Sequence, residues 1–189
     1  MYPPIIGVTG QKFNGKDTVA DYLVKNHGYT KLSLAGPLKE MCRTLFGFTD
    51  AQLYGDLKET IDPRWNITPR RAMQFVGTEM VRDTITGLLP DIGEDFWVAV
   101  LINKIAEQSL YDRRRFVISD IRFENELRCL KNYKPKSKFI RVERSSIEVN
   151  PFSVHPSETA IMTLPVDFVI ANDASLEELY TKVDALFVD

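Results

Sequence analysis

The chain has 189 residues, of which 44% are hydrophobic and 26% are charged, enough to bury the core of one globular domain without disulfides. Its net charge of −2 argues against a surface for nucleic acid or for an anionic membrane. Two cysteines give no disulfide framework, and no stretch resembles a secretion signal or the ~20 apolar residues of a membrane span, so we expect a soluble cytoplasmic protein.

Strands and helices are predicted to alternate through the first half of the chain. The apolar run at 4–8 is typical of a buried parallel strand, and a helix is predicted at 16–26. A second strand at 29–34 and a helix at 38–46 follow. Thr49 and Gln52 have the spacing of a capping box that opens a short helix, and the polar stretch 54–66 is predicted to be a loop.

The second half continues this alternation. Thr68-Pro69 is typical of a helix start, and that helix is predicted to run to about residue 86. Ser175 and Glu178 predict the cap of a last helix. The remaining predictions are helices at 95–109 and after Phe123, and strands at 115–120, 138–143 and 166–172. Such alternation indicates an α/β fold, with a mostly parallel sheet flanked by helices in three layers.

The segment GVTGQKFNGKDT (7–18) lies between the first strand and the first helix and has the glycine and lysine spacing of a phosphate-binding loop. Converging backbone N–H groups, the helix N-terminus and the Lys16 charge would all attract phosphate. The alternative is a plain glycine-rich turn. We expect the loop to bind ATP through these residues: Gly10, Lys12, Asn14, Gly15, Lys16, Asp17 and Thr18.

Asp17 stands where such loops usually carry a hydroxyl, and Thr18 follows one residue late. A carboxylate beside a polyphosphate is repelled unless a cation lies between them, and Mg²⁺ prefers hard oxygen ligands. Asp17, directly or through water, and Thr18 are therefore the predicted magnesium ligands. The alternative is that Asp17 only caps the following helix.

Five segments together resemble the deoxynucleoside monophosphate kinases of bacteriophages and related viruses. They are NGKDT (14–18), TPRRAMQFVGTEMVRDTI (68–85), DFWV (95–98), ISDIRFENE (118–126) and HPSET (155–159). The resemblance implies a single phosphate-loop kinase domain, with a helical acceptor-binding insert at about 37–110 and a short lid at about 144–164. It implies transfer of the γ-phosphate of ATP, with Mg²⁺, to a deoxynucleoside monophosphate, in the host cytoplasm if the protein is viral.

The helix predicted at 68–86 has one polar and one apolar side when its residues are spaced at ~100° each. Two first-turn arginines can bind a phosphate by paired hydrogen bonds, and Gly77 would leave room for a planar base. The apolar arc is Ala72, Met73, Phe75, Val76 and Met80. The predicted acceptor residues are Arg70, Arg71, Gln74, Gly77 and Thr78, a solvated helix face being the alternative.

Trp97 is implied by the resemblance to stack on the acceptor, although a core position is the alternative. Asp120 follows a predicted strand, and ligands of open parallel sheets bind beyond the carboxyl ends of strands. Arg122 and Glu126 share a helix face four residues apart, so the three side chains are predicted to serve the acceptor or the transferring phosphate. The alternative is an ordinary surface ion pair.

The predicted lid contains Arg144, which we expect to stabilise transferring phosphate charge; Arg113, Arg114 and Arg115 are the alternatives. His155 and Glu158 match the family segment, but a turn with a helix cap at Ser157 explains them as well. Asn172 follows the last strand and is expected to contact adenine.

The expected mechanism is direct in-line transfer of the phosphoryl group from ATP to the acceptor, which needs no covalent enzyme intermediate.

Two other functions fit part of this pattern. One is a kinase of another small acceptor, such as dephospho-coenzyme A or phosphomevalonate, and the other is a nucleotide-binding module without catalysis. Neither nucleic acid nor a membrane is an expected partner, and the sequence leaves a homodimer open.

Overall fold

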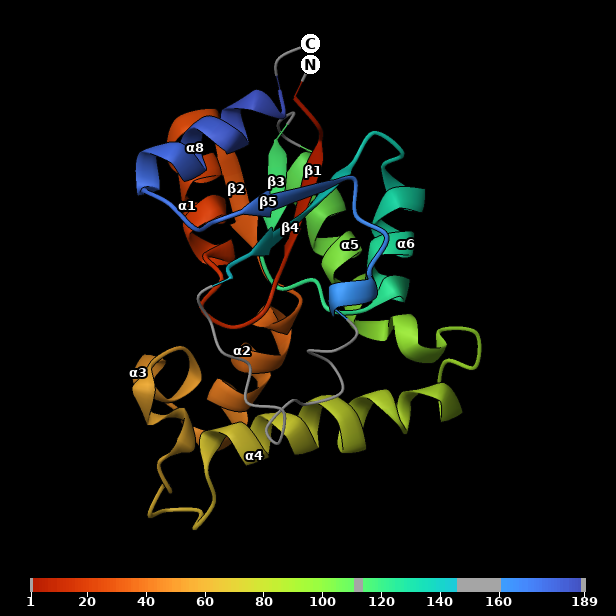
Figure 1. The fold of residues 1–189 in the computed structure, drawn as a ribbon. Helices are drawn as coiled ribbons and strands as arrows, with labels where there is room; N and C mark the ends of the chain where they lie inside the picture. The colour runs from red at the N-terminus through yellow and green to blue at the C-terminus, as the bar shows by residue number, and fades with distance from the viewer. Residues whose placement is uncertain (1, 111–113, 146–160, 188–189) are drawn as a thin grey trace. The chain divides into compact units, whose positions relative to one another are not determined.

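The computed structural model describes residues 2–110, 114–145 and 161–187 (Figure 1). Contacts divide the chain into two compact units, one formed by residues 1–33 and 102–189 and the other by residues 34–101. No helix in the described ranges is both long enough and apolar enough to cross a membrane.

The larger unit contains a five-stranded, fully parallel sheet with the strand order β2-β3-β1-β4-β5. The central strand β1 pairs with β3 on one side and with β4 on the other. The strands are β1 (Ile5–Thr9), β2 (Tyr29–Leu32), β3 (Arg115–Ile118), β4 (Lys138–Glu143) and β5 (Phe168–Ala171). All five residues of β1 are buried, as expected for a strand covered on both faces.

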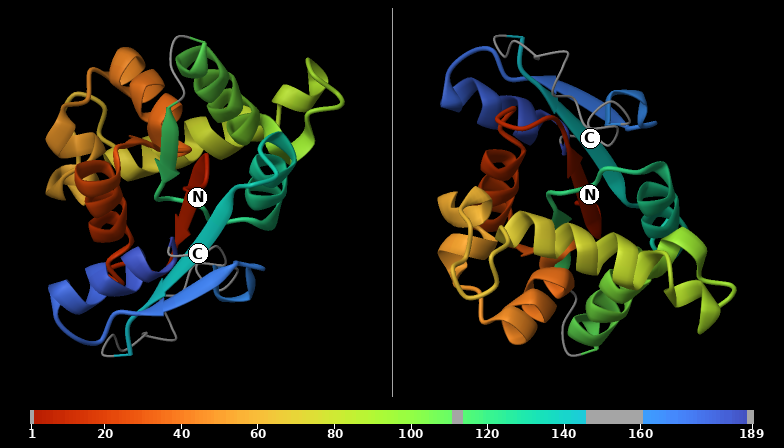
Figure 2. Two further views of the ribbon diagram at one scale, coloured as in Figure 1. Left: turned by 90° about the horizontal axis from the view of Figure 1, so that it is seen from above. Right: turned by 90° about the horizontal axis from the view of Figure 1, so that it is seen from below.

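Helices cover both faces of this sheet, which confirms the predicted three-layer α/β fold. Helices α1 (Lys16–His27) and α8 (Leu176–Ala185) lie on one face (Figure 2). Helix α6 (Glu124–Tyr133) and the later part of α5 (Phe96–Ser109) lie on the other. The core between the sheet and helices α1 and α8 is mostly aliphatic and includes Val8, Leu23 and Val183.

The smaller unit is helical. Its core includes Cys42, Phe48, Leu53, Ala72 and Val76. Its helices are α2 (Ala35–Phe46), α3 (Asp50–Leu53), the 3₁₀ turn η1 (Asp56–Glu59), α4 (Pro69–Gln74), the π-helix η2 (Phe75–Arg82) and the 3₁₀ turns η3 (Ile85–Gly87) and η4 (Gly93–Asp95).

The local signals in this unit were mostly correct. The Thr49–Gln52 capping box forms, and the Thr68 hydroxyl accepts a hydrogen bond from the Arg71 amide at the start of α4. The predicted loop at 54–66 was only partly correct, because it contains η1 and a short bridge between Asp62 and Ile67. Cys42 and Cys129 both lie in helices, and neither forms a disulfide.

The prediction of one α-helix across 68–86 was wrong, because the chain changes to a π-helix at Phe75. A π-helix bonds residue i to i+5 and so turns less per residue than an α-helix. The side chains after Gln74 therefore point elsewhere than the 100° spacing predicts. Phe75 and Met80, expected in the core, are 45% and 46% exposed, whereas Gly77, expected on the polar side, is buried.

Candidate active site

The predicted phosphate-binding loop connects the end of β1 to the start of α1, and its backbone requires glycine at two points. Gly10 has φ 149° and Gly15 has φ 97°. A β-carbon on Gly10 would lie 2.5 Å from the Val142 carbonyl oxygen, and one on Gly15 would lie 2.5 Å from Nδ2 of Asn172. A side chain larger than hydrogen would clash at either position and would be strained at these φ angles. Both glycines are therefore needed for the loop to pack closely against the residues of β4 and those after β5.

Two asparagines hold this loop against the carboxyl ends of β4 and β5. The Asn14 side-chain amide donates to the Val142 carbonyl at 3.0 Å, and the Asn172 amide donates to the Asn14 carbonyl at 2.9 Å. Asn14 is only 3% exposed, and its Oδ1 has no hydrogen-bond partner among the described residues. The Asn172 amide, which we expected to contact adenine, thus supports the loop, a role that the sequence did not indicate.

Asp17 lies in the first turn of α1 and is paired within the protein. Its Oδ1 accepts a hydrogen bond from the Ser119 hydroxyl at 3.0 Å and lies 3.1 Å from Nζ of Lys31. Burial opposes ionisation of Asp17, but the Lys31 and Ser119 hydrogen bonds and the charges of Lys31 and Lys16 outweigh it and lower its pKa. The partners on β2 and after β3, rather than helix-cap N–H groups, therefore compensate this carboxylate.

The remaining loop residues lie where the sequence predicts, between β1 and the first turn of α1. Lys16 begins α1, and Thr18 is half-buried beside it. Lys12 is exposed, with its ammonium 4.8 Å from the centre of the exposed Phe13 ring. The hydroxyl of Thr18 and the carboxylate of Asp17 are hard oxygens of the kind that Mg²⁺ accepts, and Mg²⁺ usually takes most of its other ligands from water and phosphate. The donor chemistry therefore fits, although the described residues contain no cluster of three or more His, Cys, Asp or Glu that could hold a metal.

Asp120 lies beyond β3, at the same edge of the sheet as the loop, because β1 and β3 are parallel. Its Oδ2 accepts a hydrogen bond of 2.7 Å from the Ser33 hydroxyl, which follows β2. The Thr9 hydroxyl, at the end of β1, donates to the Ile121 carbonyl at 2.7 Å. Three neighbouring strand ends are thus joined at one edge.

The prediction that Arg122 and Glu126 share a helix face was wrong, because α6 begins at Glu124 and Arg122 precedes it. The two residues are instead connected by a hydrogen bond from the Arg122 backbone to the Glu126 side chain. Glu126 Oε2 accepts from the Arg122 amide at 2.7 Å and from the Phe123 amide at 3.0 Å, which caps the start of α6. Burial, aided by the Asp120 charge and only partly opposed by these backbone bonds, raises the pKa of Glu126 to about 7. Glu126 therefore fixes the backbone from which Arg122 projects.

Arg144 is exposed directly after β4, at this same edge. The next residue, Ser145, donates to the Asp173 carboxylate through its amide at 2.6 Å and its hydroxyl at 2.9 Å, which lowers the Asp173 pKa. Asp173 follows Asn172, so one dipeptide contacts both the loop and the start of the predicted lid. His155, Ser157 and Glu158 lie outside the described residues, as does most of that lid.

Two of the alternative lid arginines, Arg114 and Arg115, do not fit this edge. Arg115 begins β3 and donates to the His27 carbonyl at 2.6 Å, at the amino ends of the strands. Arg114 precedes it, and Arg113 lies outside the described residues. The notion that Arg115 reaches the donor phosphates was therefore wrong, since parallel strands place the loop at the opposite edge.

The five predicted acceptor residues belong to the smaller unit, and four of them are exposed to solvent. Arg70 pairs with Glu59, and Arg71 pairs with Glu79. The exposed four are Arg70, Arg71, Gln74 and Thr78. The Arg71 guanidinium lies 5.9 Å from the centre of the Phe75 ring, and both residues line a cavity of about 340 Å³.

Gly77 and Trp97 pack together inside the smaller unit. The Trp97 indole N–H donates to the Gly77 carbonyl at 3.0 Å, and a β-carbon on Gly77 would lie 2.8 Å from a Leu38 methyl group. The expected space for a base beside Gly77 is thus occupied by Leu38. Trp97 is partly buried in the core of this unit, as its alternative interpretation predicted.

The chain matches a known family over nearly its whole length. The family model for deoxynucleotide monophosphate kinase matches residues 4–57 and 43–183. A protein of Acanthamoeba polyphaga mimivirus described as a deoxynucleotide monophosphate kinase is 34% identical over 190 residues, covering 95% of this chain and 93% of the relative. The deoxynucleotide monophosphate kinase of Enterobacteria phage T4 is 20% identical and covers 95% and 96%.

Solved structures with the same fold are also kinases. A sugar kinase from Janibacter sp. HTCC2649 has a TM-score of 0.51 at 12% identity, covering 97% of this chain and 94% of that one. A gluconokinase from Sinorhizobium meliloti 1021 has a TM-score of 0.50 at 16% identity, with coverage of 97% and 91%. These two similarities concern the fold. The sequence matches, together with the loop of residues 10–18 at the end of β1, show that the chain is a kinase and belongs to the deoxynucleotide monophosphate kinase family.

Proposed function

We propose that this protein transfers the γ-phosphate of ATP, with Mg²⁺, to a deoxynucleoside 5′-monophosphate. The observation that carries the proposal is family membership together with two phosphate-binding features: the loop of residues 10–18 and the paired exposed arginines at the start of α4. A nucleoside monophosphate kinase needs both, because it holds a donor and an acceptor phosphate at once.

The donor would bind at the loop. Its backbone amides and the N-terminus of α1 attract the ATP phosphates, and Lys16 adds a full positive charge. Gly10, Asn14 and Gly15 keep the loop in shape, and Asn172 holds it from β5.

Mg²⁺ would be held by the Thr18 hydroxyl and, through water, by Asp17. When bound, this ion neutralises charge on the donor phosphates. The pairing of Asp17 with Lys31 supports an indirect contact, since one oxygen of that carboxylate already faces an ammonium group. Asp120, which accepts from Ser33, would orient the acceptor or a water of the ion from the same edge.

The acceptor phosphate would bind Arg70 and Arg71. The two guanidinium groups now pair with Glu59 and Glu79, and the phosphate would replace these carboxylates and accept paired hydrogen bonds. Gln74, at the end of α4, and Thr78, in η2, are both exposed and would contact the base. Phe75 offers an aromatic surface next to Arg71. Trp97 would act indirectly by holding Gly77 and thus the helix.

Chemistry in this site would rest on positioning and charge. A phosphate oxygen of the acceptor is already a nucleophile, so direct in-line transfer needs no covalent enzyme intermediate. Arg122, whose backbone Glu126 fixes, and Arg144 would stabilise charge on the transferring group. We place catalysis in the cytoplasm, of the host if the protein is viral, with no nucleic-acid or membrane partner.

The deciding experiment is an ADP-release assay with ATP and Mg²⁺ across all deoxynucleoside and ribonucleoside monophosphates, with diphosphate products identified by mass spectrometry. We expect turnover of at least one deoxynucleotide, its loss in Lys16→Ala and a raised acceptor KM in Arg71→Ala. Turnover of dephospho-coenzyme A or phosphomevalonate alone would replace the proposed acceptor. Binding of ATP without any product would instead favour the non-catalytic module.

A further inference from the structure

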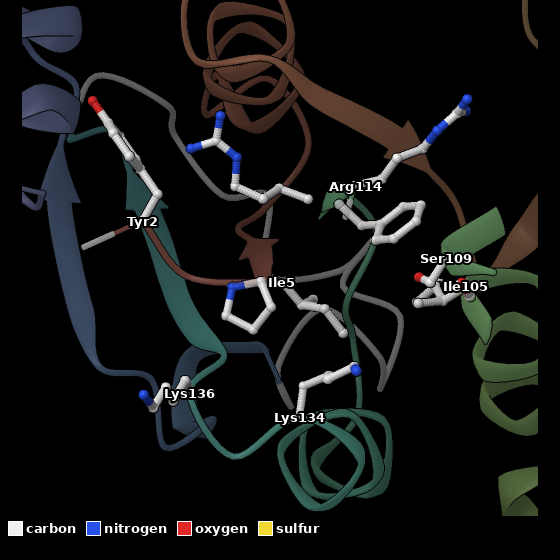
Figure 3. A pocket seen from close by; sticks show the side chains of 10 residues that line it. Tyr2, Ile5, Ile105, Ser109, Arg114, Lys134 and Lys136 are labelled. Carbon is white, nitrogen blue, oxygen red and sulfur yellow. Dashed lines mark hydrogen bonds between the residues drawn. The ribbon is translucent and has the colours of Figure 1, made fainter. Parts of the chain in front are cut away.

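The two edges of the sheet in the larger unit differ in how their polar side chains are arranged. At the amino ends of β1 and β3 lies a cavity of about 410 Å³, but the charged ends of Arg114 and Lys136 point away from it on opposite sides (Figure 3). At the carboxyl ends, hydrogen bonds instead connect the residues beyond β4 and β5 to each other and to the phosphate-binding loop. Polar side chains therefore meet at the edge where the donor phosphates are proposed to bind.

The pairing of β4 with β5 continues beyond the last residues of both strands. The amide of Asn172, directly after β5, donates to the Glu143 carbonyl at 2.8 Å. The next contact uses a side chain, because the Asp173 carboxylate accepts from the Ser145 amide at 2.6 Å and from the Ser145 hydroxyl at 2.9 Å. Arg144 lies between these two contacts in the sequence, so its backbone is held on both sides.

Asp173 precedes α8 but does not cap that helix. The Ser175 hydroxyl provides the cap by accepting a hydrogen bond from the Glu178 amide at 3.2 Å. Within the described parts of the chain, the carboxylate of Asp173 accepts hydrogen bonds from Ser145 alone. Helix capping therefore does not account for this carboxylate, whereas its contact with the end of β4 does.

Electrostatics keep Asp173 ionised. The two hydrogen bonds from Ser145, followed by the charges of Lys182 and Arg144, lower the pKa of Asp173. Arg144 is exposed, and no described residue forms a hydrogen bond or an ion pair with its guanidinium. The cation is thus oriented by its backbone and by the nearby negative charge, and it can still bind a phosphate.

The turn that contains Asp173 also contacts the phosphate-binding loop. The Asn172 side chain donates to the Asn14 carbonyl, and the Asn14 side chain donates to the carbonyl of Val142, two residues before Arg144. Because Asn172 and Asp173 are adjacent, one turn holds both the loop and the backbone of Arg144. The place of this cation is therefore linked to the place of the donor phosphates.

We propose that Asp173 is a positioning residue, which holds the backbone at Ser145 so that Arg144 reaches the phosphates bound by the loop of residues 10–18. The inference rests on the proposed function for the role of Arg144 and adds the residue that places it. Asp173, occupied by Ser145, acts through Arg144 and does not touch the nucleotide. The competing account is that Asp173 only joins the ends of two strands.

The test compares variants of the full-length protein. Asp173→Ala removes both acceptors of the Ser145 hydrogen bonds. Asp173→Asn removes the charge but keeps both bonds, because its oxygen can accept from the Ser145 amide and its NH₂ group can donate to the hydroxyl. Glu177→Ala removes an exposed carboxylate of α8 and is the matched charge control. Asp173→Ala is also combined with Arg144→Ala.

The first measurement is kcat with ATP, Mg²⁺ and an accepted deoxynucleotide. We expect kcat to fall about tenfold in Asp173→Ala and to change less than about threefold in Asp173→Asn and in Glu177→Ala. In the Arg144→Ala background, Asp173→Ala should lower kcat by less than about twofold. Losses that multiply in the double variant, or an Asp173→Asn protein as slow as Asp173→Ala, would overturn the proposal in favour of a structural role.

The second measurement needs no acceptor and so separates this inference from the proposed function. Arginine modification by phenylglyoxal, read by mass spectrometry, reports whether ATP protects Arg144. We expect protection in the unmodified protein and in Asp173→Asn, and much weaker protection in Asp173→Ala. Equal protection in all variants, or none in any, would contradict the placement of Arg144. This pattern of protection without turnover of any deoxynucleotide would refute the proposed function and still support the placement.

Discussion

The side-chain amide of Asn172 lies 2.9 Å from the carbonyl oxygen of Asn14, across 158 positions of sequence. This bond joins the end of β5 to the phosphate-binding loop, and Asn172 Nδ2 occupies the space beside Gly15 that a β-carbon would need. The loop is thus shaped by the far end of the chain as well as by its own glycines.

We predict that Asn172→Asp raises the KM for ATP about tenfold with a smaller change in kcat. Aspartate keeps the shape of the side chain but replaces the donor with an acceptor, so the Asn14 carbonyl loses its partner and faces a like partial charge. Steady-state kinetics will check this. Asn103→Asp, the same chemical change at an exposed position of α5, serves as the control, and equal KM values for the two variants would refute the role of Asn172.

The second prediction concerns Lys31, which compensates Asp17 within the protein. Lys31→Met should raise the Asp17 pKa and weaken ATP binding several-fold, because an unpaired carboxylate then faces the phosphates. In the double variant Lys31→Met/Asp17→Asn the repulsion is absent, so its loss of affinity should be smaller than the sum of the single losses. Lys25→Met on α1 controls for charge, and additive losses in the ATP titrations would contradict the pairing.

The third prediction is a pH dependence from Glu126. Its folded pKa is about 7, above the ordinary value of 4.5, so the folded state binds the extra proton more tightly than the unfolded state. Proton binding by Glu126 therefore stabilises the folded state fully below pH 4.5, and this stabilisation is lost as pH rises through about 7. Thermal unfolding should show a decline in Tm between pH 5 and 8 that is weaker in Glu126→Gln. The same decline in both proteins would assign the effect to another group.

The fourth prediction tests the π-helix. Phe75→Ser should cost less than about 1 kcal/mol of unfolding free energy, because this side chain is 45% exposed. Val76→Ala, at a position that is 1% exposed, should cost about 1–3 kcal/mol. Chemical denaturation measures both. A larger cost for Phe75 than for Val76 would mean that the segment is an α-helix with the predicted apolar arc.

The sequence by itself determined the features that depend on neighbouring residues. The alternation of apolar runs and amphipathic segments predicted a parallel α/β fold, and Gly10, Gly15 and Lys16 between a strand and a helix predicted the loop. The Thr68-Pro69 start and the Thr49–Gln52 capping box followed in the same way, because each is formed by residues within one turn. Together these motifs were specific enough to indicate the family.

Only the tertiary structure decided the features that join distant residues. Lys31 and Ser119 come to Asp17 from separate strands, and Asn172 comes to Asn14 from the last one, so no local spacing could have revealed them. The π-helix that begins at Phe75 contains Gly77, which packs against Leu38 and Trp97, and a helical wheel contains neither contact. Periodicity reports which side of an element is apolar, whereas packing against the rest of the chain decides which side chains meet.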